Sequence, residues 1–470
     1  MVARWTKHGD GRTLAPGEVV KPDERMSWPR MVGFGAQHVV AMFGATFVFP
    51  LVMGLDPNIA IMFSGVATIM FLLIVNGRIP SYLGTSASFV GGVLAIRSLY
   101  GGDTPAADAI VTGAVLVVGL VLALVGLAVQ RLGVRVINQV FPPVVTGAVV
   151  MLIGFGLAYV VADVYWPQDQ WIALVTMTAT FLFLVVLRGF AGRIAILLGL
   201  VLGFALSWAA DRVLGDVTAY NAVTQRIDTH PRVNLSAVAD AAWVGWPDTH
   251  LPDIRVSAVL LVLPAVIALV AENVGHVKAV GEMTRTDVDP YLGRAVAADG
   301  LATAVASAFG GSPTTTYAEN IGVMAATRVY STAAYYIAAL IAILFGLCPK
   351  FGALIAATPG GVLGGITVIL YGMIGLLGAK IWVENRVDFS DPVNMVPIGA
   401  GIILAIGPVR HTFGSAFTLE GIALGTVVVV GGYHLLRVLR RGDRAGGGAT
   451  GGQDGGGQDG GGTGEGRAVG

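Results

Sequence analysis

Two ionisable residues interrupt a stretch of the chain that is otherwise almost purely apolar. Glu272 follows residues 256–271, which contain no charged side chain and would cross most of a bilayer as a helix. A charge at the bilayer centre costs about 2.5–3.5 kcal/mol on insertion scales, so such a residue usually faces a protein interior and has a function there. His276 lies four residues later on the same helical face, where its imidazole and the carboxylate can share a proton or orient each other. The alternative is that Glu272 lies at a wetted helix end with His276 as a cap.

Glu319 is a second acid, placed where a Gly-, Ser-, Thr- and Pro-rich segment at 310–317 runs into an apolar helix. A helix N-terminus presents free N–H groups and a partial positive charge. These groups can bind a polar substrate, and they also favour an ionised Glu319. The alternative is a capping box formed by Thr316 and Glu319, which does not exclude a binding role.

The elements that must hold these acids are membrane helices. The chain is 55% hydrophobic and only 12% charged, about half the charged fraction of a soluble domain, and its mean hydropathy is +0.75. With 29 basic and 29 acidic residues it has no electrostatic footprint for nucleic acid. The single cysteine, Cys348, excludes an intrachain disulfide and a Cys-based zinc cluster, and the histidines show no metal-binding spacing. We therefore expect an all-α polytopic membrane protein in the lipid bilayer, with no metal and no organic cofactor.

Apolar runs and their breakers predict fourteen membrane spans. Two of the predicted segments are divisible into half-helices, by Pro142 and Pro143 in one and by Pro359 in the other. The predicted spans are 31–51, 58–76, 83–99, 107–129, 137–162, 170–187, 192–212, 256–275, 292–309, 318–331, 332–348, 353–378, 394–408 and 418–437.

The positive-inside rule tests this count independently of hydropathy. Lys and Arg follow every even-numbered span, for example Arg78, Arg131, Lys278 and Arg437, and they are also present in the N-terminal tail. This pattern predicts both termini in the cytoplasm and an inner (plasma) membrane protein. The expected organisation is a cytoplasmic tail at 1–30, a first repeat at 31–212, an extracytoplasmic loop at 213–255, a second repeat at 256–437 and a disordered Gly-rich cytoplasmic tail at 438–470.

The long loop at the midpoint predicts two halves of seven spans, and because seven is odd the second half would be inverted relative to the first. The third span of each half carries an interruption, at 82–88 and at 310–317. Non-helical backbone at membrane depth survives only where it is buried in protein or lines a wet cavity. The two interruptions therefore indicate a substrate site.

These residues resemble the nucleobase–cation symporters of the nucleobase–ascorbate transporter group, and most of all the bacterial uracil and pyrimidine permeases. The resemblance covers roughly residues 30–440. Its most specific part is 319–328, which fits the family signature of an acid or amide, Asn, any residue, Gly, four residues, Thr and Arg. Other matching positions are 271–276, Gln37, His38, Asp299, Gly300, Tyr317 and Ala318.

The resemblance implies a core domain of spans one to four and eight to eleven, a gate domain of spans five to seven and twelve to fourteen, and alternating access. It implies that Glu272 and Glu319 bind the base, with His276 supporting the proton coupling, so that H⁺ is the expected coupling ion. Backbone at Ala87 and Ala318 would add contacts, with Tyr317 and Ala45 alongside. It also implies a homodimer through the gate domains.

Ala87 departs from the family pattern, because uracil permeases carry a Phe there whose ring packs against the base. Phe89, two positions later, replaces that ring only if the local geometry differs. The extra room makes thymine or xanthine a candidate beside uracil, so a xanthine or purine permease is one alternative.

Functions outside nucleobase transport are also compatible with a helical membrane protein. One is an anion carrier on the same scaffold, and two acids at the site argue against it. An intramembrane enzyme or a channel is disfavoured because no HExxH or GxSxG motif is present and broken helices with acids suit an occluding carrier.

Overall fold

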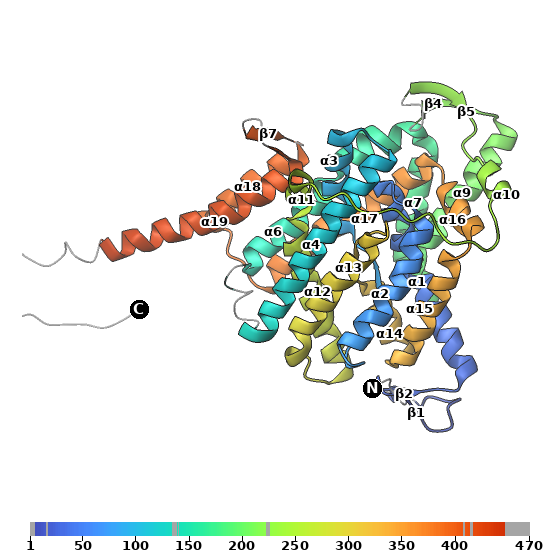
Figure 1. Ribbon diagram of the computed structural model, residues 1–470, viewed down its shortest axis with the longest axis horizontal. Helices are drawn as coiled ribbons and strands as arrows, with labels where there is room; N and C mark the ends of the chain where they lie inside the picture. Colours follow the sequence, from blue (N-terminus) through green and yellow to red (C-terminus); the bar gives the residue numbers. More distant parts are fainter. Residues whose placement is uncertain are drawn as a thin grey trace, which may run out of the picture.

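Helices make up 71% of the computed structural model, which describes residues 5–15, 17–133, 139, 141–221, 226–407, 409–413 and 417–446. They pack side by side into a bundle that runs between two ends (Figure 1). One end, here called the hairpin end, carries the hairpins β4–β5 and β7–β8; the other, the N-terminal end, carries β1 and β2 (Figure 1). The helices are α1 (Trp28–Met53), α2 (Pro57–Ile74), α3 (Val90–Tyr100), α4 (Pro105–Leu132), α6 (Pro143–Phe155), α7 (Gln170–Val186), α8 (Gly189–Arg193), α9 (Ala195–Val213), α10 (Ser236–Asp240), α11 (Val256–Val262), α12 (Ala265–Thr284), α13 (Leu292–Ala308), α14 (Ala318–Thr327), α15 (Thr332–Gly346), α16 (Pro349–Ala356), α17 (Gly360–Glu384), α18 (Pro392–Ile406) and α19 (Gly421–Gly446).

Short elements complete the described part of the chain. Four are single turns: η1 (Ala87–Phe89), η2 (Val160–Tyr165), η3 (Trp166–Gln168) and η4 (Asp289–Tyr291). The strands form four two-stranded ladders, of which β1 (Thr6–Lys7) with β2 (Glu24–Arg25) is parallel. The antiparallel ladders are β3 (Leu83–Thr85) with β6 (Thr314–Thr316), β4 (Val217–Asn221) with β5 (Arg226–His230), and β7 (Arg410–Phe413) with β8 (Phe417–Glu420).

Each of the fourteen predicted spans contains a helix of the described structure. Within the described residues, seven helical segments are long and apolar enough to cross a membrane alone, one of them being α6 continued through η2 and η3. Two bent pairs, α11 with α12 and α15 with α16, qualify when each is taken together. Helices α3 and α14 have only 11 and 10 residues, as expected for half-helices that begin inside the bilayer. The prediction of a polytopic helical membrane protein with broken third and tenth spans is confirmed.

The eighth span differs from its predicted course in two ways. The chain bends by 41° between α11 and α12, because Pro264 lacks the N–H that a continuous helix would need at that point. In addition, α12 continues to Thr284, nine residues beyond the predicted end at 275. Glu272 and His276 therefore lie in the middle of α12, so the alternative that they mark a helix end is wrong.

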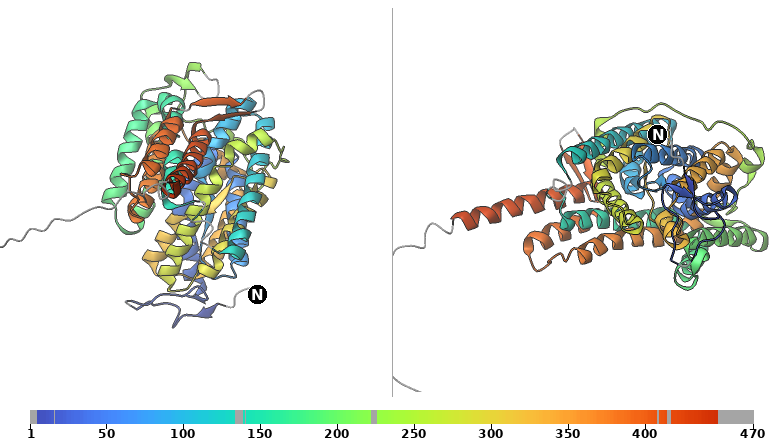
Figure 2. Two further views of the ribbon diagram at one scale, coloured as in Figure 1. Left: turned by 90° about the vertical axis from the view of Figure 1, so that its left-hand side faces the viewer. Right: turned by 90° about the horizontal axis from the view of Figure 1, so that it is seen from below.

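The packing of the helices follows the inverted repeat. Helix α2 packs against α15, and α13, the equivalent of α2 in the second half, packs against α4, the equivalent of α15. Helices α6 and α17, the fifth spans of the two halves, pack against each other, and so do the interrupted segments β3 and β6. The first four spans of each half thereby form one group, the core, and the remaining spans form the gate (Figure 2).

Glycines bring the paired helices into backbone contact. On α4, a Cβ at Gly119 would lie 2.9 Å from the carbonyl oxygen of Gly300 on α13, and a Cβ at Gly126 would overlap the backbone of Ala297. In the gate, Gly147 of α6 approaches the carbonyl oxygen of Gly378 on α17. Small residues allow such close approach, which in a bilayer replaces the hydrophobic effect as the source of helix association.

The N-terminal segment is folded against the core rather than extended. The Val20 N–H donates to the Arg328 carbonyl, and the Tyr330 N–H donates to the Val20 carbonyl, at 2.9 and 2.8 Å. The Trp5 indole N–H donates to the hydroxyl of Thr332 at 2.8 Å. This segment therefore covers the chain between α14 and α15, immediately after the half-helix that begins at Glu319.

We expect Gly126→Val to destabilise the core because its side chain has no space against the backbone of Ala297. Overpacking of this kind costs about 1–3 kcal/mol. The apparent melting temperature of the purified protein in detergent measures the effect. Gly399→Val on α18 is the matched control, because nothing lies within 4 Å of a Cβ at Gly399. Equal melting temperatures for the two variants would contradict this account of the packing.

Candidate functional site

The site is built on the ladder between β3 and β6. Leu83, Gly84 and Thr85 pair with Thr316, Thr315 and Thr314, and all six residues are buried. The pairing extends beyond the ladder, because the Ser86 N–H donates to the Pro313 carbonyl and the Tyr317 N–H donates to the Tyr82 carbonyl, at 2.9 and 3.0 Å. Extended backbone is thereby satisfied inside the protein, as a membrane interior requires. The short helices η1 and α14 start directly after the two strands.

Tyr317 locks the ladder to α1. Its hydroxyl donates to the Thr85 carbonyl at 2.8 Å and accepts from the Thr46 hydroxyl at 3.2 Å. Its ring lies against Gly84, where a Cβ would come within 2.5 Å of it. Tyr317 is only 4% exposed, and Ala45, the neighbour of Thr46 on α1, is also buried. Tyr317 and Ala45 therefore support the ladder from the side of α1.

The hydrogen bond that the structure gives to His276 runs to β6. Its Nδ1 lies 2.9 Å from the Thr316 hydroxyl. Thr316 therefore does not cap α14; the N-cap residue is Tyr317, which makes no side-chain cap hydrogen bond. The capping-box alternative for Thr316 and Glu319 is wrong, because the threonine belongs to the strand and its hydroxyl faces α12. His276 ties the middle of α12 to the broken segment.

A cavity of about 670 Å³ lies between the core and the gate in front of this ladder. Its core wall includes Ala87, Ser88, Glu272, His276 and Ala318. Its gate wall is apolar and is contributed by α6 and α17 through Val150, Ile153, Ile374 and Leu377. The mouth is charged and lies where α12 and α17 end, at the N-terminal end of the bundle, and its charged residues are Lys278, Glu282, Lys380 and Glu384.

The predicted site residues fall into two sets. Four of them, Ala87, Glu272, His276 and Ala318, line the cavity together although they come from three separate segments. Glu319 follows Ala318 in the first turn of α14, is partly exposed, and is close enough to Glu272 for the two carboxyls to interact electrostatically.

Phe89 belongs to the other set, with Tyr317 and Ala45. Its side chain is fully buried in the hydrophobic core and is not among the residues that line the cavity. Ala87, two residues earlier, does line it, so the cavity wall at this point is a methyl group and a backbone segment.

Two buried polar pairs hold the helices of the site together. Asn320, the second residue of the signature, donates from its side-chain amide to the carbonyl of His38 on α1 at 3.0 Å. Asn273, next to Glu272, donates to the carboxyl of Asp299 on α13 at 2.5 Å. The amide of Asn320 also lies 3.1 Å from the His38 ring nitrogen Nδ1. Each acid of the site therefore has an amide neighbour that anchors its helix.

The apolar gate wall was missed by the sequence analysis. Val150, Ile153 and Ile374 lie in continuous apolar helices, where cavity-facing and lipid-facing residues have the same chemistry. Only the pairing of α6 with α17 through their glycines shows which face of each helix points inward. No signal in the sequence distinguishes these positions.

We expect Gly84→Ala to impair the site more than the fold. The added Cβ would lie 2.5 Å from the Tyr317 ring and 2.6 Å from the Thr46 hydroxyl, well inside normal contact distance. The ring must move, and with it the start of α14. Binding of radiolabelled uracil, from the ligand class that the sequence indicates, should fall at least tenfold, while Gly372→Ala, with open space around its Cβ, should bind normally. Normal binding by Gly84→Ala would show that Tyr317 does not position the site.

The similarity to known proteins extends over most of the chain. The xanthine/uracil permease family model, described as a permease family, matches residues 30–413. RutG of Escherichia coli (strain K12), named as a candidate pyrimidine permease, is 43% identical over 88% of this chain and 91% of its own length. The uracil permease of Bacillus caldolyticus is 35% identical over 88% of this chain and 93% of its own length. The uracil permease of Escherichia coli (strain K12) is 34% identical over 89% and 94%.

Solved structures share the fold at low sequence identity. Murine Slc26a9, an anion transporter solved in an inward-facing state, superposes with a TM-score of 0.62 at 12% identity over 88% of this chain and 69% of its own. The transmembrane domain of the cyanobacterial bicarbonate transporter BicA gives 0.56 at 16% identity over 84% and 96%. The core and gate architecture is therefore that of a known transporter fold.

The matched relatives are permeases, so the expectation of a transporter rather than an enzyme is confirmed. The apolar helices and the family together make this a multi-pass membrane protein. From the family model, the relatives and the shared fold, the chain belongs to the nucleobase–cation symporter-2 family of permeases.

Proposed function

We propose that this protein imports a nucleobase together with a proton, and that the base is uracil or a related pyrimidine. The observation that carries the proposal is that Glu272 lines the cavity beside the start of the half-helix α14, whose first turn carries Glu319 within electrostatic reach of Glu272. The relatives' names support the substrate class, because two of them are uracil permeases and one is named as a candidate pyrimidine permease.

The chemistry of the cavity matches an imide ring. A pyrimidine base presents alternating N–H donors and C=O acceptors, so a carboxylate can accept from N–H while free backbone N–H groups donate to C=O. The first turn of α14 offers such an N–H group at Ala318, because the N-cap Tyr317 does not occupy it with its side chain, whereas the Glu319 N–H bonds its own carboxyl. The apolar wall of α6 and α17 suits the flat faces of the ring.

The two carboxyls supply a route to proton coupling. Glu272 and Glu319 interact electrostatically in a site that is largely shielded from water, where two negative charges repel strongly. A proton on one of them removes the repulsion and turns that carboxyl into a donor. Uracil is neutral, so the membrane potential can act on its transport only through the coupled ion. One charge crossing 100 mV contributes about 2.3 kcal/mol, enough for roughly 50-fold accumulation.

The open mouth of the cavity supports alternating access. It lies at the end of the bundle that carries the N-terminal segment, and the distribution of Lys and Arg predicts that this end faces the cytoplasm. The structure would then be inward-open, with the base released between α12 and α17. Movement of the core against the gate would expose the same cavity to the other side of the plasma membrane.

Two alternatives concern the substrate rather than the scaffold. Ala87 leaves room beside the ladder, which favours a larger base such as xanthine as a second candidate. An anion, as carried by the two solved proteins that share the fold, fits less well because two acids stand at the site.

Uptake into proteoliposomes tests the substrate directly. Radiolabelled uracil should accumulate when the proton gradient is directed inward and should only equilibrate without it. Thymine and xanthine serve as competitors and sulfate as the anion control. Failure of every nucleobase to accumulate or to compete would overturn the proposal, and inhibition by sulfate alone would favour the anion carrier.

We expect Glu272→Gln and Glu319→Gln each to lose accumulation, because a glutamine keeps the shape but cannot take up a proton. The roughly 50-fold gradient that 100 mV sustains should fall to equilibration. Glu282→Gln, at the exposed mouth of the same cavity, is the matched control and should accumulate normally. Full accumulation by both site variants would show that the acids are assigned wrongly even if the protein transports bases.

We expect Ala87→Phe to narrow the selectivity of the transporter, because the added ring fills the space beside the ladder. Inhibition of uracil uptake by xanthine should weaken about tenfold, the discrimination typical of a misfit in an apolar pocket. Ala279→Phe, nearer the mouth of the cavity, should leave the inhibition by xanthine unchanged. If Ala87→Phe does not change the concentration of xanthine that inhibits uracil uptake, the base binds elsewhere in the cavity.

A further inference from the structure

A second cavity, of about 600 Å³, lies at the hairpin end of the bundle. We call it the outer cavity. Its core side is the end of α3 with the loop that follows, and its gate side is η2 and the hairpin β7–β8. It shares no lining residue with the substrate cavity. The residues that line the outer cavity are Leu94, Arg97, Ser98, Gly101, Gly102, Asp103, Tyr159, Val160, Val164, Arg410 and Glu420.

Helix α3 connects the two cavities. The turn that precedes it, η1, begins at Ala87 in the substrate cavity, and α3 reaches Ser98 in the outer cavity. The eleven helical steps from residue 87 to residue 98 rise about 16 Å. A solute that moved between the two cavities along α3 would therefore have to pass the middle of this helix.

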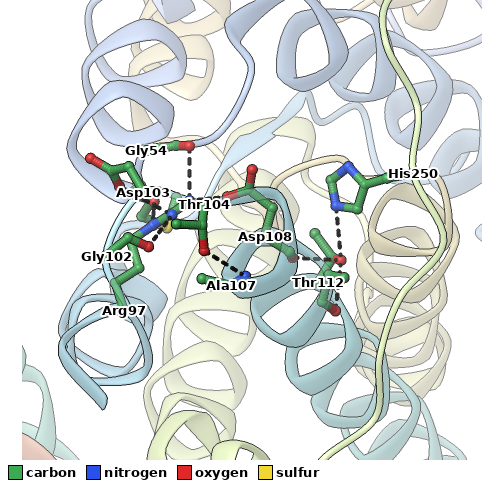
Figure 3. Close-up of polar contacts among 11 residues, drawn as sticks. Gly54, Arg97, Gly102, Asp103, Thr104, Ala107, Asp108, Thr112 and His250 are labelled. Atoms are coloured by element: carbon green, nitrogen blue, oxygen red, sulfur yellow. Dashed lines mark hydrogen bonds and ion pairs between the residues drawn. The ribbon is translucent and has the colours of Figure 1, made fainter. Parts of the chain in front are cut away.

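Arg97 makes the core wall of the outer cavity rigid. Its guanidinium donates to the carbonyls of Met53 and Gly54 at the end of α1 and pairs with the carboxyls of Asp103 and Asp108, at distances of 2.5–3.1 Å (Figure 3). The guanidinium is almost fully buried, and it joins α1, α3 and α4 at one point. Opening of the outer cavity must then come from the gate side.

The path between the cavities is closed by Ile422, in the first turn of α19. A Cβ at Gly91 on α3 would overlap the Ile422 side chain, and a Cβ at Gly156 after α6 would lie 2.6 Å from it. Gly92 packs in the same way on α11, where a Cβ would lie 2.5 Å from the Val262 side chain. The space that remains here is only about 20 Å³, enough for about one water molecule. The gate thus packs the branched side chain of Ile422 against the backbone of the core at Gly91.

The hairpin β7–β8 forms a second layer above Ile422. Arg410 begins β7, and its guanidinium pairs with the Glu420 carboxylate across the hairpin at 2.5 Å. The same guanidinium donates to the Ser98 hydroxyl of α3 at 3.4 Å, a long contact that bridges gate and core. Glu420 lies two residues before Ile422, so the Arg410–Glu420 ion pair and the Ile422 side chain move together.

We propose that Ile422 and Arg410 are the outer gate of the transport cycle, closed in this structure, and that the outer cavity is the vestibule through which the solute enters. This inference rests on the proposed function, since a gate has meaning only if solute passes between core and gate. The Ile422 side chain packs on Gly91 through apolar contact alone, so its withdrawal from α3 leaves no polar group without a hydrogen-bond partner. The long contact from Arg410 to Ser98 is half exposed and can break at low cost.

The charges of the outer cavity fit a neutral solute. Two cations, Arg97 and Arg410, stand with two anions, Asp103 and Glu420, and each cation is paired with an anion. The vestibule therefore has no net charge that would concentrate anions or cations in front of the gate.

Labelling of a cysteine inside the substrate cavity tests the gate. Ser88→Cys is placed in a protein that also carries Cys348→Ala, and intact cells are treated from outside with a membrane-impermeant maleimide. We expect slow labelling, because Ile422 closes the path, and labelling at least threefold faster after Ile422→Ala. Ile403→Ala, an isoleucine on the exposed surface of α18, is the matched control and should leave the rate unchanged. Equal rates with and without Ile422→Ala would overturn the proposal.

Cross-linking tests the movement of the same gate. A short bifunctional thiol reagent that can be cleaved by reduction should join Ser98→Cys to Arg410→Cys. The cross-link should lower the rate of uracil uptake at least tenfold, and reduction should restore the rate. Leu99→Cys with Arg410→Cys is the control, since Leu99 is a neighbouring residue on another face of α3. Undiminished uptake by the cross-linked protein would overturn the gate. Absence of uracil uptake in the parent protein would instead overturn the proposed function, and the labelling experiment would still decide on the gate.

Discussion

The structure depends on the pairing of two short extended segments inside the membrane. Backbone N–H and C=O groups that leave a helix at this depth have no water to bind, and an unpaired group costs several kcal/mol. β3 and β6 resolve this for each other, because each strand supplies the partners that the other lacks. The pairing brings the starts of η1 and α14 together from opposite halves of the chain. The proposed solute site, beside the starts of these two helices, depends on that crossing.

The surroundings of the ladder convert this backbone feature into the proposed binding site. Tyr317 holds the ladder on α1, and His276 holds it on α12, so that Glu272 is carried to the same cavity as Ala87 and Ala318. Glycine-mediated contacts make the core and the gate two firmly packed groups of helices. The cavity lies between them, open at one end and closed at the other by a small apolar contact. This distribution of firm and weak contacts is what a carrier needs if one group moves against the other.

The sequence predicts the parts of this arrangement that depend on residues unusual in an apolar chain. A carboxylate such as Glu272 is conspicuous among residues that should be uncharged, and a break rich in Gly, Ser and Pro is conspicuous among helices. The inverted repeat and the fourteen segments follow from the same patterns. The register of β3 with β6, the hydrogen bond from His276 to Thr316 and the apolar gate wall do not follow. Each of these depends on contacts between segments far apart in the chain, and in an apolar helix the side chains that face a cavity look like those that face lipid.

The central claim is that the carboxyls at one cavity couple the movement of a neutral base to that of a proton. A pH-sensitive dye enclosed in proteoliposomes measures this without an imposed gradient. We expect uracil added outside to acidify the interior as it enters, and Glu272→Gln to abolish the acidification while Glu282→Gln preserves it. Entry of uracil with no change of internal pH in the unmodified protein would contradict the account.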